Sequence, residues 1–180
     1  MTLYSTYYAS PMGKITLCSN QNALLGLWIE GQKYFGDTVK GKMQENANLP
    51  ILTQSKKWLD DYFLGKNPLI KTLNLAPIGG EFRQLVWQEL CEIPYGEVTT
   101  YGNIAKTVAK KMGKTSMSAQ AVGGAVGRNP ISIIIPCHRV VGSNRSLTGY
   151  AGGLDKKIEL LTIEGVNVTS FFRPKKGSAL

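Results

Sequence analysis

The sequence predicts an α+β protein, with a small sheet domain followed by a mainly helical domain. Short β-rich segments separated by turn residues fill residues 3–30, whereas apolar residues at helical spacing dominate from residue 51 onward. A stretch rich in Gly and Pro, "APIGG" at 76–80, divides the two parts. We therefore expect an N-terminal domain at 1–78, a C-terminal domain at 79–170 and a basic, flexible tail at 171–180.

The first domain should be an antiparallel meander with one helix. The segments "LYSTYYAS", "KITLCSN" and "ALLGLWIE" read as strands, and "PMG" and "QNA" supply the turn residues between them. In "ILTQSKKWLDDYFLG", Leu52, Trp58 and Leu59 fall at helical spacing, and Gly65 ends the pattern.

The second domain should contain a run of short helices. "EFRQLVWQELCEI" is an amphipathic helix stopped by "PYGE". Thr99 or Thr100 can cap a helix through "YGNIAKTVAKKMG", which Gly113 ends, and Ser116 or Ser118 can cap "AQAVGGAV". Two short helices joined by a Gly-containing turn resemble a helix-turn-helix, although a tight helical corner that binds no nucleic acid fits the same pattern.

Charge is distributed unevenly along the chain. The net charge is +9, and residues 98–154 carry seven basic side chains but no Asp or Glu. A surface with only positive charges could bind a polyanion such as nucleic acid. Alternatively, it is a solvated basic face that maintains solubility.

The helix "AQAVGGAV" is almost bare of side chains. Each Gly costs it up to about 1 kcal/mol relative to Ala, so something must approach it closely. Either another helix or a narrow nucleic-acid groove would fit.

Composition excludes several function classes. No apolar run approaches the roughly 20 residues needed to cross a bilayer, and the N-terminus lacks the pattern of a signal peptide, so we expect a cytoplasmic protein with no membrane association. Three cysteines without a CxxC pair argue against a disulfide framework or zinc knuckle, and a single histidine excludes a His-rich metal site. Cys18 and Cys91 should pack as small apolar residues. We predict no metal and no cofactor.

The stretch "IIIPCHRVV" places the chain's only histidine, His138, directly after Cys137. A cysteine attacks as its thiolate and needs a base or a positive field, for which His138 and Arg139 are the local candidates. In a regular strand neighbouring side chains point to opposite faces, so Pro136 must bend the chain or a water must bridge the pair. A bare Cys-His pair is more often structural than catalytic.

The surroundings of this pair carry a resemblance. "GRNPISIIIPCHRVVG" followed by "SLTGYAGG" closely resembles the active-site signature of the methylated-DNA-protein-cysteine methyltransferases, also called O6-alkylguanine-DNA alkyltransferases. The similarity extends through "PYGEVTTYGNIA", "AQAVGGAVGRNP" and "KKIELLTIEG", and so covers residues 80–166. The strands of the first domain agree with the family's RNase H-like domain.

The resemblance implies a stoichiometric, irreversible repair reaction. Cys137 would take a methyl or larger alkyl group from O6 of guanine, or from O4 of thymine, in DNA. His138 would act as base through a water, and Glu164 would hold the imidazole tautomer. Tyr101 would donate a hydrogen bond to N3 of guanine, and Asn129 would brace the turn before the reactive cysteine.

The resemblance also implies a base pocket and a DNA-binding helix. Because O6 lies inside the stacked duplex, the base must flip out into a pocket. Its expected lining is Tyr150, Ala151, Val140 and Val126. The second helix of the pair would dock in the minor groove of double-stranded DNA with little sequence preference, and the protein would act as a monomer. The expected DNA contacts are Ser118, Gln120, Ala121, Gly123, Gly124 and Arg128.

The sequence departs from the family at one important position. Gln120 aligns with the arginine that usually fills the gap left by the flipped base, and five more residues than expected separate Tyr101 from Gln120. Two other hypotheses remain. The first is a binding-only protein of this family, which would lack the reactive cysteine that this chain keeps. The second is a helix-turn-helix regulator that uses Cys137 as a sensor.

Overall fold

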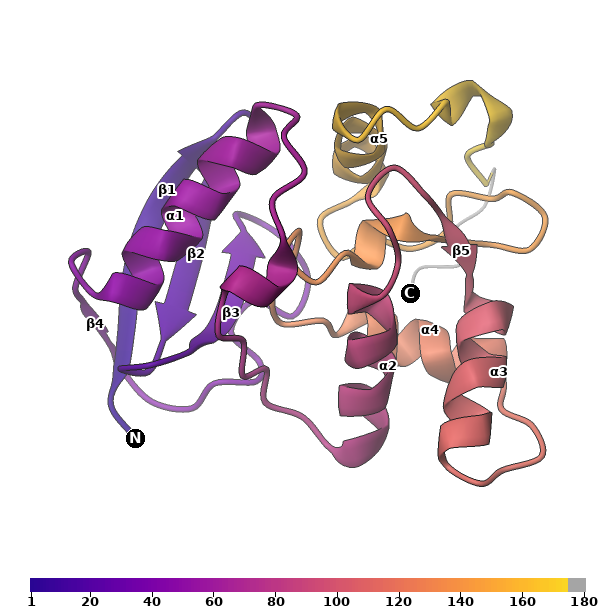
Figure 1. Cartoon of the computed structure of the whole chain (residues 1–180), viewed down its shortest axis with the longest axis horizontal. Helices are drawn as coiled ribbons and strands as arrows, with labels where there is room; N and C mark the ends of the chain where they lie inside the picture. The colour runs from indigo at the N-terminus through magenta and orange to yellow at the C-terminus, as the bar shows by residue number, and fades with distance from the viewer. Residues whose placement is uncertain (175–180) are drawn as a thin grey trace. The chain divides into compact units, whose positions relative to one another are not determined.

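The computed structural model describes residues 1–174, which form two compact units (Figure 1). The N-terminal unit comprises Met1–Gly79 together with Pro130–Ile134, and the C-terminal unit comprises Gly80–Asn129 and residues 135–174. The inclusion of Pro130–Ile134 in the first unit was not expected from the sequence. It arises because this segment hydrogen-bonds to the backbone of Leu27.

The N-terminal unit is a four-stranded sheet with one long helix. Its strands are β1 (Leu3–Ser10), β2 (Gly13–Ser19), β3 (Leu24–Ile29) and β4 (Met43–Glu45), its helix is α1 (Pro50–Phe63), and Ile70–Thr72 forms a short 3₁₀ turn. The sheet order is β3-β2-β1-β4, and β1 pairs antiparallel with β2, as does β2 with β3. The predicted meander is therefore confirmed. β4 was missed because "MQE" has no strand pattern, and it pairs parallel with β1, so the sheet is mixed.

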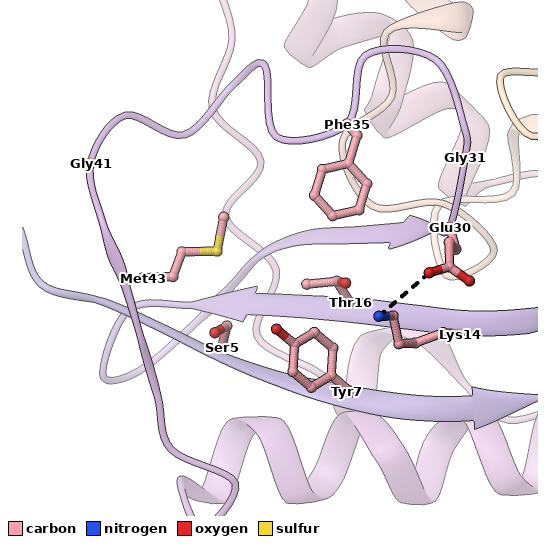
Figure 2. Close-up of a pocket in the computed structure, with 9 residues that line it drawn as sticks. All are labelled: Ser5, Tyr7, Lys14, Thr16, Glu30, Gly31, Phe35, Gly41 and Met43. Carbon is pink, nitrogen blue, oxygen red and sulfur yellow. Dashed lines mark ion pairs between the residues drawn. The ribbon is translucent and has the colours of Figure 1, made fainter.

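The two faces of this sheet are used differently (Figure 1). Tyr8 stacks on Phe63 of α1 and donates a hydrogen bond to Asp60, so α1 covers one face. Tyr7, its neighbour in β1, points to the other face because side chains alternate along a strand. That face borders a cavity of about 480 Å³, where Figure 2 shows Phe35 and Met43 beside the strands and the ion pair between Lys14 and Glu30 at 3.4 Å.

The C-terminal unit is mainly helical. Its elements are α2 (Glu81–Cys91), β5 (Thr99–Thr100), α3 (Tyr101–Lys111), α4 (Ala119–Gly127), a 3₁₀ turn at Cys137–Arg139, β6 (Val140–Val141), α5 (Leu154–Ile163) and a 3₁₀ turn at Val168–Ser170. The parallel pair of β5 with β6 joins the start of α3 to the chain that follows Cys137.

Local sequence explains where the predicted helix pair begins and ends. Thr100 caps α3 by accepting a hydrogen bond from the backbone N–H of Asn103 at 3.1 Å, and Ser118 caps α4 in the same way from Ala121 at 3.0 Å. Gly113, with φ of 64°, follows the end of α3 as predicted. The indole of Trp87 on α2 donates to the carbonyl of Ala125, which ties α4 to the core of the unit.

The predicted tail begins too early. The backbone of Phe172 donates to the carbonyl of Arg145 and accepts from the N–H of Leu147, at 3.2 and 2.9 Å, because this segment pairs with Ser146. Phe171 packs partly buried against Leu147 and Leu161. Residues 175–180 of the predicted tail lie outside the described residues. No helix within residues 1–174 is long and apolar enough to cross a membrane.

Candidate active site

Pro136 does bend the chain, and Cys137 begins a 3₁₀ turn rather than continuing a strand. The backbone N–H of Cys137 donates to the carbonyl of Ile135 at 2.8 Å, which makes a tight turn centred on Pro136. The Asn129 amide donates to the same carbonyl at 2.8 Å. Asn129 therefore contributes a buried hydrogen bond to the turn before the cysteine.

His138 and Glu164 are in direct contact. Nε2 of His138 lies 2.5 Å from Oε1 of Glu164, and both side chains are fully buried. Burial lowers the pKa of His138, so the ring is neutral near pH 7. Since the carboxylate can only accept, Nε2 carries the hydrogen and Nδ1 keeps the lone pair that can take a proton.

Glu164 is held by more groups than the sequence indicated. Nε and Nη2 of Arg139 donate to its two oxygens at 2.8 and 3.0 Å, and the backbone N–H of Gly96 donates at 3.1 Å. Burial by itself raises the pKa of Glu164, but the hydrogen bonds and charges of His138 and Arg139 outweigh it and lower that pKa to about 2. The carboxylate is therefore ionised throughout the physiological range.

Gly96 is required beside this carboxylate. Its φ is 78°, a conformation that side chains disfavour, and a Cβ built there would lie 2.9 Å from the backbone oxygen of Glu164. Nη1 of Arg139, meanwhile, donates to the carbonyl of Ile93 at 2.6 Å. Arg139 is not among the groups that shift the pKa of Cys137, and its guanidinium is instead bonded to Glu164 and Ile93.

The positive charge that acts on Cys137 comes from Lys157 instead. Burial raises the pKa of the thiol, while the Asn129 amide, the Lys157 charge and nearby backbone hydrogen bonds lower it. Lys157 is fully buried in α5, and its ammonium donates to the carbonyls of Val140, Thr148 and Gly149 at 2.5, 2.9 and 3.2 Å. Burial lowers the pKa of Lys157 to about 8, so the group remains largely charged at neutral pH.

Cys137 borders a small hollow. Its lining consists of Tyr101, Gly123, Val126, Gly127, Cys137, Gly149, Tyr150 and Ala151. The predicted pocket residues Tyr150, Ala151 and Val126 therefore lie together around the thiol, whereas Val140 is fully buried and lies outside this lining. The hollow holds only about 10 Å³, roughly one water, so a purine cannot enter unless its walls move.

The two tyrosines of the hollow differ in their hydrogen bonds. Tyr101 donates its hydroxyl to the carbonyl of Thr148 at 3.0 Å. The hydroxyl of Tyr150 is buried and makes no hydrogen bond to any residue from 1 to 174. Burial raises the pKa of both, so each hydroxyl can donate but does not ionise near neutral pH.

The predicted DNA-binding residues lie on α4 and at its two ends. Ser118, Gln120, Ala121 and Gly124 are exposed, whereas Gly123 is buried and Arg128 is half-buried. A Cβ built at Gly124 would meet no atom within 4 Å. No packing within the described chain therefore explains the missing side chain at this position.

Larger cavities lie elsewhere. Besides the 480 Å³ cavity of the N-terminal sheet, a cavity of about 300 Å³ lies between α2 and α3, lined in part by Glu89, Glu92 and Glu97. Neither contains a predicted site residue, and no group of three or more His, Cys, Asp or Glu side chains among residues 1–174 is arranged to hold a metal ion.

Comparison with known protein families decides the assignment. Residues 81–166 match the family described as 6-O-methylguanine DNA methyltransferase, DNA binding domain, and residues 3–77 match its ribonuclease-like domain. The chain belongs to the 6-O-methylguanine DNA methyltransferase family.

Individual members of the 6-O-methylguanine DNA methyltransferase family are similar over nearly the whole chain. The methylated-DNA–protein-cysteine methyltransferase of Haemophilus influenzae is 40% identical, with 91% of this chain and 87% of that protein covered. The constitutive Bacillus subtilis protein of that name is 34% identical over 91% and 96%. The Mycobacterium tuberculosis O6-methylguanine methyltransferase structure has a TM-score of 0.77 at 35% identity, covering 91% and 93%. A further structure from that organism, described as OGT in complex with DNA, has the same TM-score.

Sequence reasoning missed Lys157 and the carbonyls that it binds. A signal was available, because Lys157 lies three residues after Leu154 and four before Leu161, on the apolar face of α5. A lysine on such a face is either an extended, solvent-reaching side chain or a buried ammonium with specific partners, and the structure shows the second.

Proposed function

We propose that this protein repairs alkylated DNA directly, by moving an alkyl group from O6 of guanine to Sγ of Cys137. The observation that carries the proposal is the position of the thiol. It lies on the wall of the hollow and directly precedes His138 in a turn. His138, Glu164 and Arg139 form a buried cluster in which the imidazole is neutral and the carboxylate is ionised. Family membership supports the same reaction class.

The proposed chemistry begins with removal of the thiol proton. Nδ1 of His138 takes it through a bridging water, and Glu164 stabilises the imidazolium that forms. The charge of Lys157 and the amide of Asn129 favour the thiolate. Sγ then attacks the alkyl carbon, a C–S bond forms, the C–O6 bond breaks, and its electron pair stays on the guanine.

Charge that grows on the leaving base needs a donor. Tyr101 can supply its hydroxyl to N3 of guanine if it gives up its hydrogen bond to the carbonyl of Thr148. The hydroxyl of Tyr150 is a second donor on the wall of the hollow. The product is a saturated thioether, from which water would have to expel an unactivated thiolate, so each protein molecule reacts once.

Entry of the base requires the hollow to widen. Gly123, Gly127 and Gly149 contribute to its walls, and they can shift without moving bulky side chains. We propose that flipping of the damaged guanine out of double-stranded DNA and this widening occur together. Tyr150, Ala151 and Val126 would then contact the base, with Val140 behind them.

We further propose that α4 binds the minor groove of DNA. Gly124 and Ala121 leave the exposed face of α4 without large side chains. The open space at Gly124 would let the walls of the minor groove approach the helix backbone closely. Contacts to the DNA backbone would give weak sequence preference and strong salt dependence. The protein would act as a monomer. It would work in the cytoplasm, where it has access to the DNA.

Mass spectrometry of the intact protein, with peptide mapping, tests the reaction. After incubation with a duplex that carries O6-methylguanine, we expect one added methyl on the peptide that contains Cys137, saturating at one per protein. Cys137→Ser should gain none and should keep its DNA affinity. If the wild type gains no methyl while the duplex stays bound, the protein is a binding-only member of the family.

A further inference from the structure

The chain that leads into the reactive turn is attached to the N-terminal sheet. The N–H of Leu27 in β3 donates to the carbonyl of Pro130 at 2.9 Å, and the N–H of Ser132 donates to the carbonyl of Leu27 at 3.0 Å. Leu27 and Ile131 form a parallel bridge. Only four residues separate Ser132 from Cys137.

A buried glutamine fastens this segment through its side chain. Oε1 of Gln32 accepts from the N–H of Ile29 at 2.7 Å and from the hydroxyl of Ser132 at 3.1 Å. Gln32 and Ser132 are 6% and 2% exposed, so water cannot readily replace either partner. The two residues are 100 positions apart in the sequence, and the contact depends on the folded unit.

The residue after Ser132 has an unfavourable backbone. Ile133 is fully buried and β-branched, yet its φ is 70°, in the region that side chains disfavour. The N–H of Ile134 donates to the carbonyl of Ser132 at 2.8 Å and closes a three-residue turn around it. A conformation of this kind is energetically unfavourable and persists only where its surroundings hold it.

We propose that Gln32 and Ser132 are positioning residues for alkyl transfer by Cys137. They hold the start of the strained turn at Ile133, from which the chain passes through the second tight turn at Pro136 to the cysteine. Neither residue lines the hollow beside Cys137. Their effect is to fix the direction in which Sγ points, and the inference rests on the proposed transfer reaction.

This arrangement gives the sheet unit a part in the chemistry. A misplacement of about 1 Å at a reacting atom can slow a reaction roughly 100-fold. Loosening the segment that precedes Cys137 should therefore slow methyl transfer while leaving the exposed face of α4, and with it DNA affinity, unchanged.

Single-turnover transfer from an O6-methylguanine duplex, with protein in excess, tests the proposal. We expect Gln32→Leu to slow transfer about tenfold and Ser132→Ala about threefold to fivefold, with DNA affinity within about twofold of wild type. The double variant should be no slower than Gln32→Leu, because both changes break one contact. Ser132→Thr keeps the hydroxyl and should restore most of the rate.

Ser55→Ala is the matched control. Ser55 is also fully buried in the N-terminal unit and donates its hydroxyl to the carbonyl of Ile51 at 2.8 Å, but it lies in α1, away from the chain entering Cys137. All variants are compared at a temperature where unfolding curves show each to be folded. The inference is overturned if Ser132→Ala slows transfer no more than Ser55→Ala, or if Gln32→Leu reacts at the wild-type rate. Failure of the wild type to react would instead overturn the proposed function.

Discussion

Glu164 and Gly124 lie in the same unit but in opposite surroundings. Glu164 is buried, ionised and bonded to His138, Arg139 and Gly96, so each of its oxygens has specified donors. Gly124 is exposed on α4 and meets nothing within 4 Å. Partners from distant parts of the chain determine the charge and orientation of Glu164. At Gly124, the absence of a side chain leaves the helix surface open.

The difference matches the two demands of the proposed function, proton transfer and DNA binding. Proton transfer needs charges withdrawn from water, because burial strengthens electrostatic interactions and makes an unpaired group costly. Binding in a DNA groove needs an exposed helix face without large side chains. A substitution at the buried site should therefore change reaction rate and stability, and one on α4 should change DNA affinity.

The largest expected effect comes from Glu164→Gln. The amide keeps the shape of the carboxylate but loses the charge that fixes the His138 tautomer, so we expect methyl transfer to slow by about 100- to 1,000-fold. Single-turnover kinetics measure this loss, and DNA affinity should not change. Glu159→Gln on the exposed side of α5 is the control, and an equal loss in both variants would contradict the assigned role of Glu164.

Lys157→Met should mainly reduce stability. It leaves the carbonyls of Val140, Thr148 and Gly149 without their buried donor, at a cost of about 3 kcal/mol in the free energy of unfolding. Urea denaturation measures it, with Lys110→Met on the exposed face of α3 for comparison. The pKa of Cys137 should also rise, because the Lys157 charge lowers it. A variant as stable as wild type would show that these bonds contribute little.

Acid should destabilise the protein through Glu164. Its pKa is about 2 in the folded chain against an ordinary value of 4.5, so its contribution is complete above pH 4.5 and is lost as pH falls toward 2. The shift corresponds to about 3 kcal/mol. Denaturation at a series of pH values should show this loss, and Glu164→Gln should flatten the curve in that window. An unchanged slope in the variant would mean that other carboxylates cause the acid sensitivity.

Substitutions at Gly124 should separate helix stability from DNA binding. Gly124→Ala should stabilise the fold by up to about 1 kcal/mol, since Ala is the better helix former and the space is open. Gly124→Leu should keep the fold but weaken binding to undamaged duplex about tenfold, because the side chain fills the approach to the groove. Thermal unfolding and fluorescence anisotropy measure the two effects. If Gly124→Leu binds the duplex as tightly as wild type, α4 is not part of the DNA interface.

The smallest expected effect is that of Gln120→Arg. An added cation on the exposed face of α4 should tighten duplex binding or speed repair by about threefold to tenfold, and it should steepen the salt dependence of binding by about one counterion. Anisotropy titrations at several salt concentrations, together with transfer kinetics, measure these changes. If neither changes, the side chain at this position does not reach the DNA.

The sequence by itself determined three strands of the N-terminal sheet, the helix pair with its caps, and the Cys137–His138 pair. Local residue patterns predict the three strands, and capping residues predict the helix pair that begins at Thr100 and Ser118. The Cys137–His138 pair belongs to a short motif that can be recognised without the fold. It did not indicate β4, whose three residues have no strand pattern and are held only by pairing with β1.

Only the tertiary structure decided which charges act on the reaction. Arg139 lies two residues after the cysteine but is paired with Glu164, while Lys157, twenty residues after the cysteine, is the buried charge that lowers the pKa of the thiol. Gln32 reaches Ser132 across 100 positions. Local sequence cannot specify such pairings, because burial and partner choice follow from packing between segments that are distant in the chain.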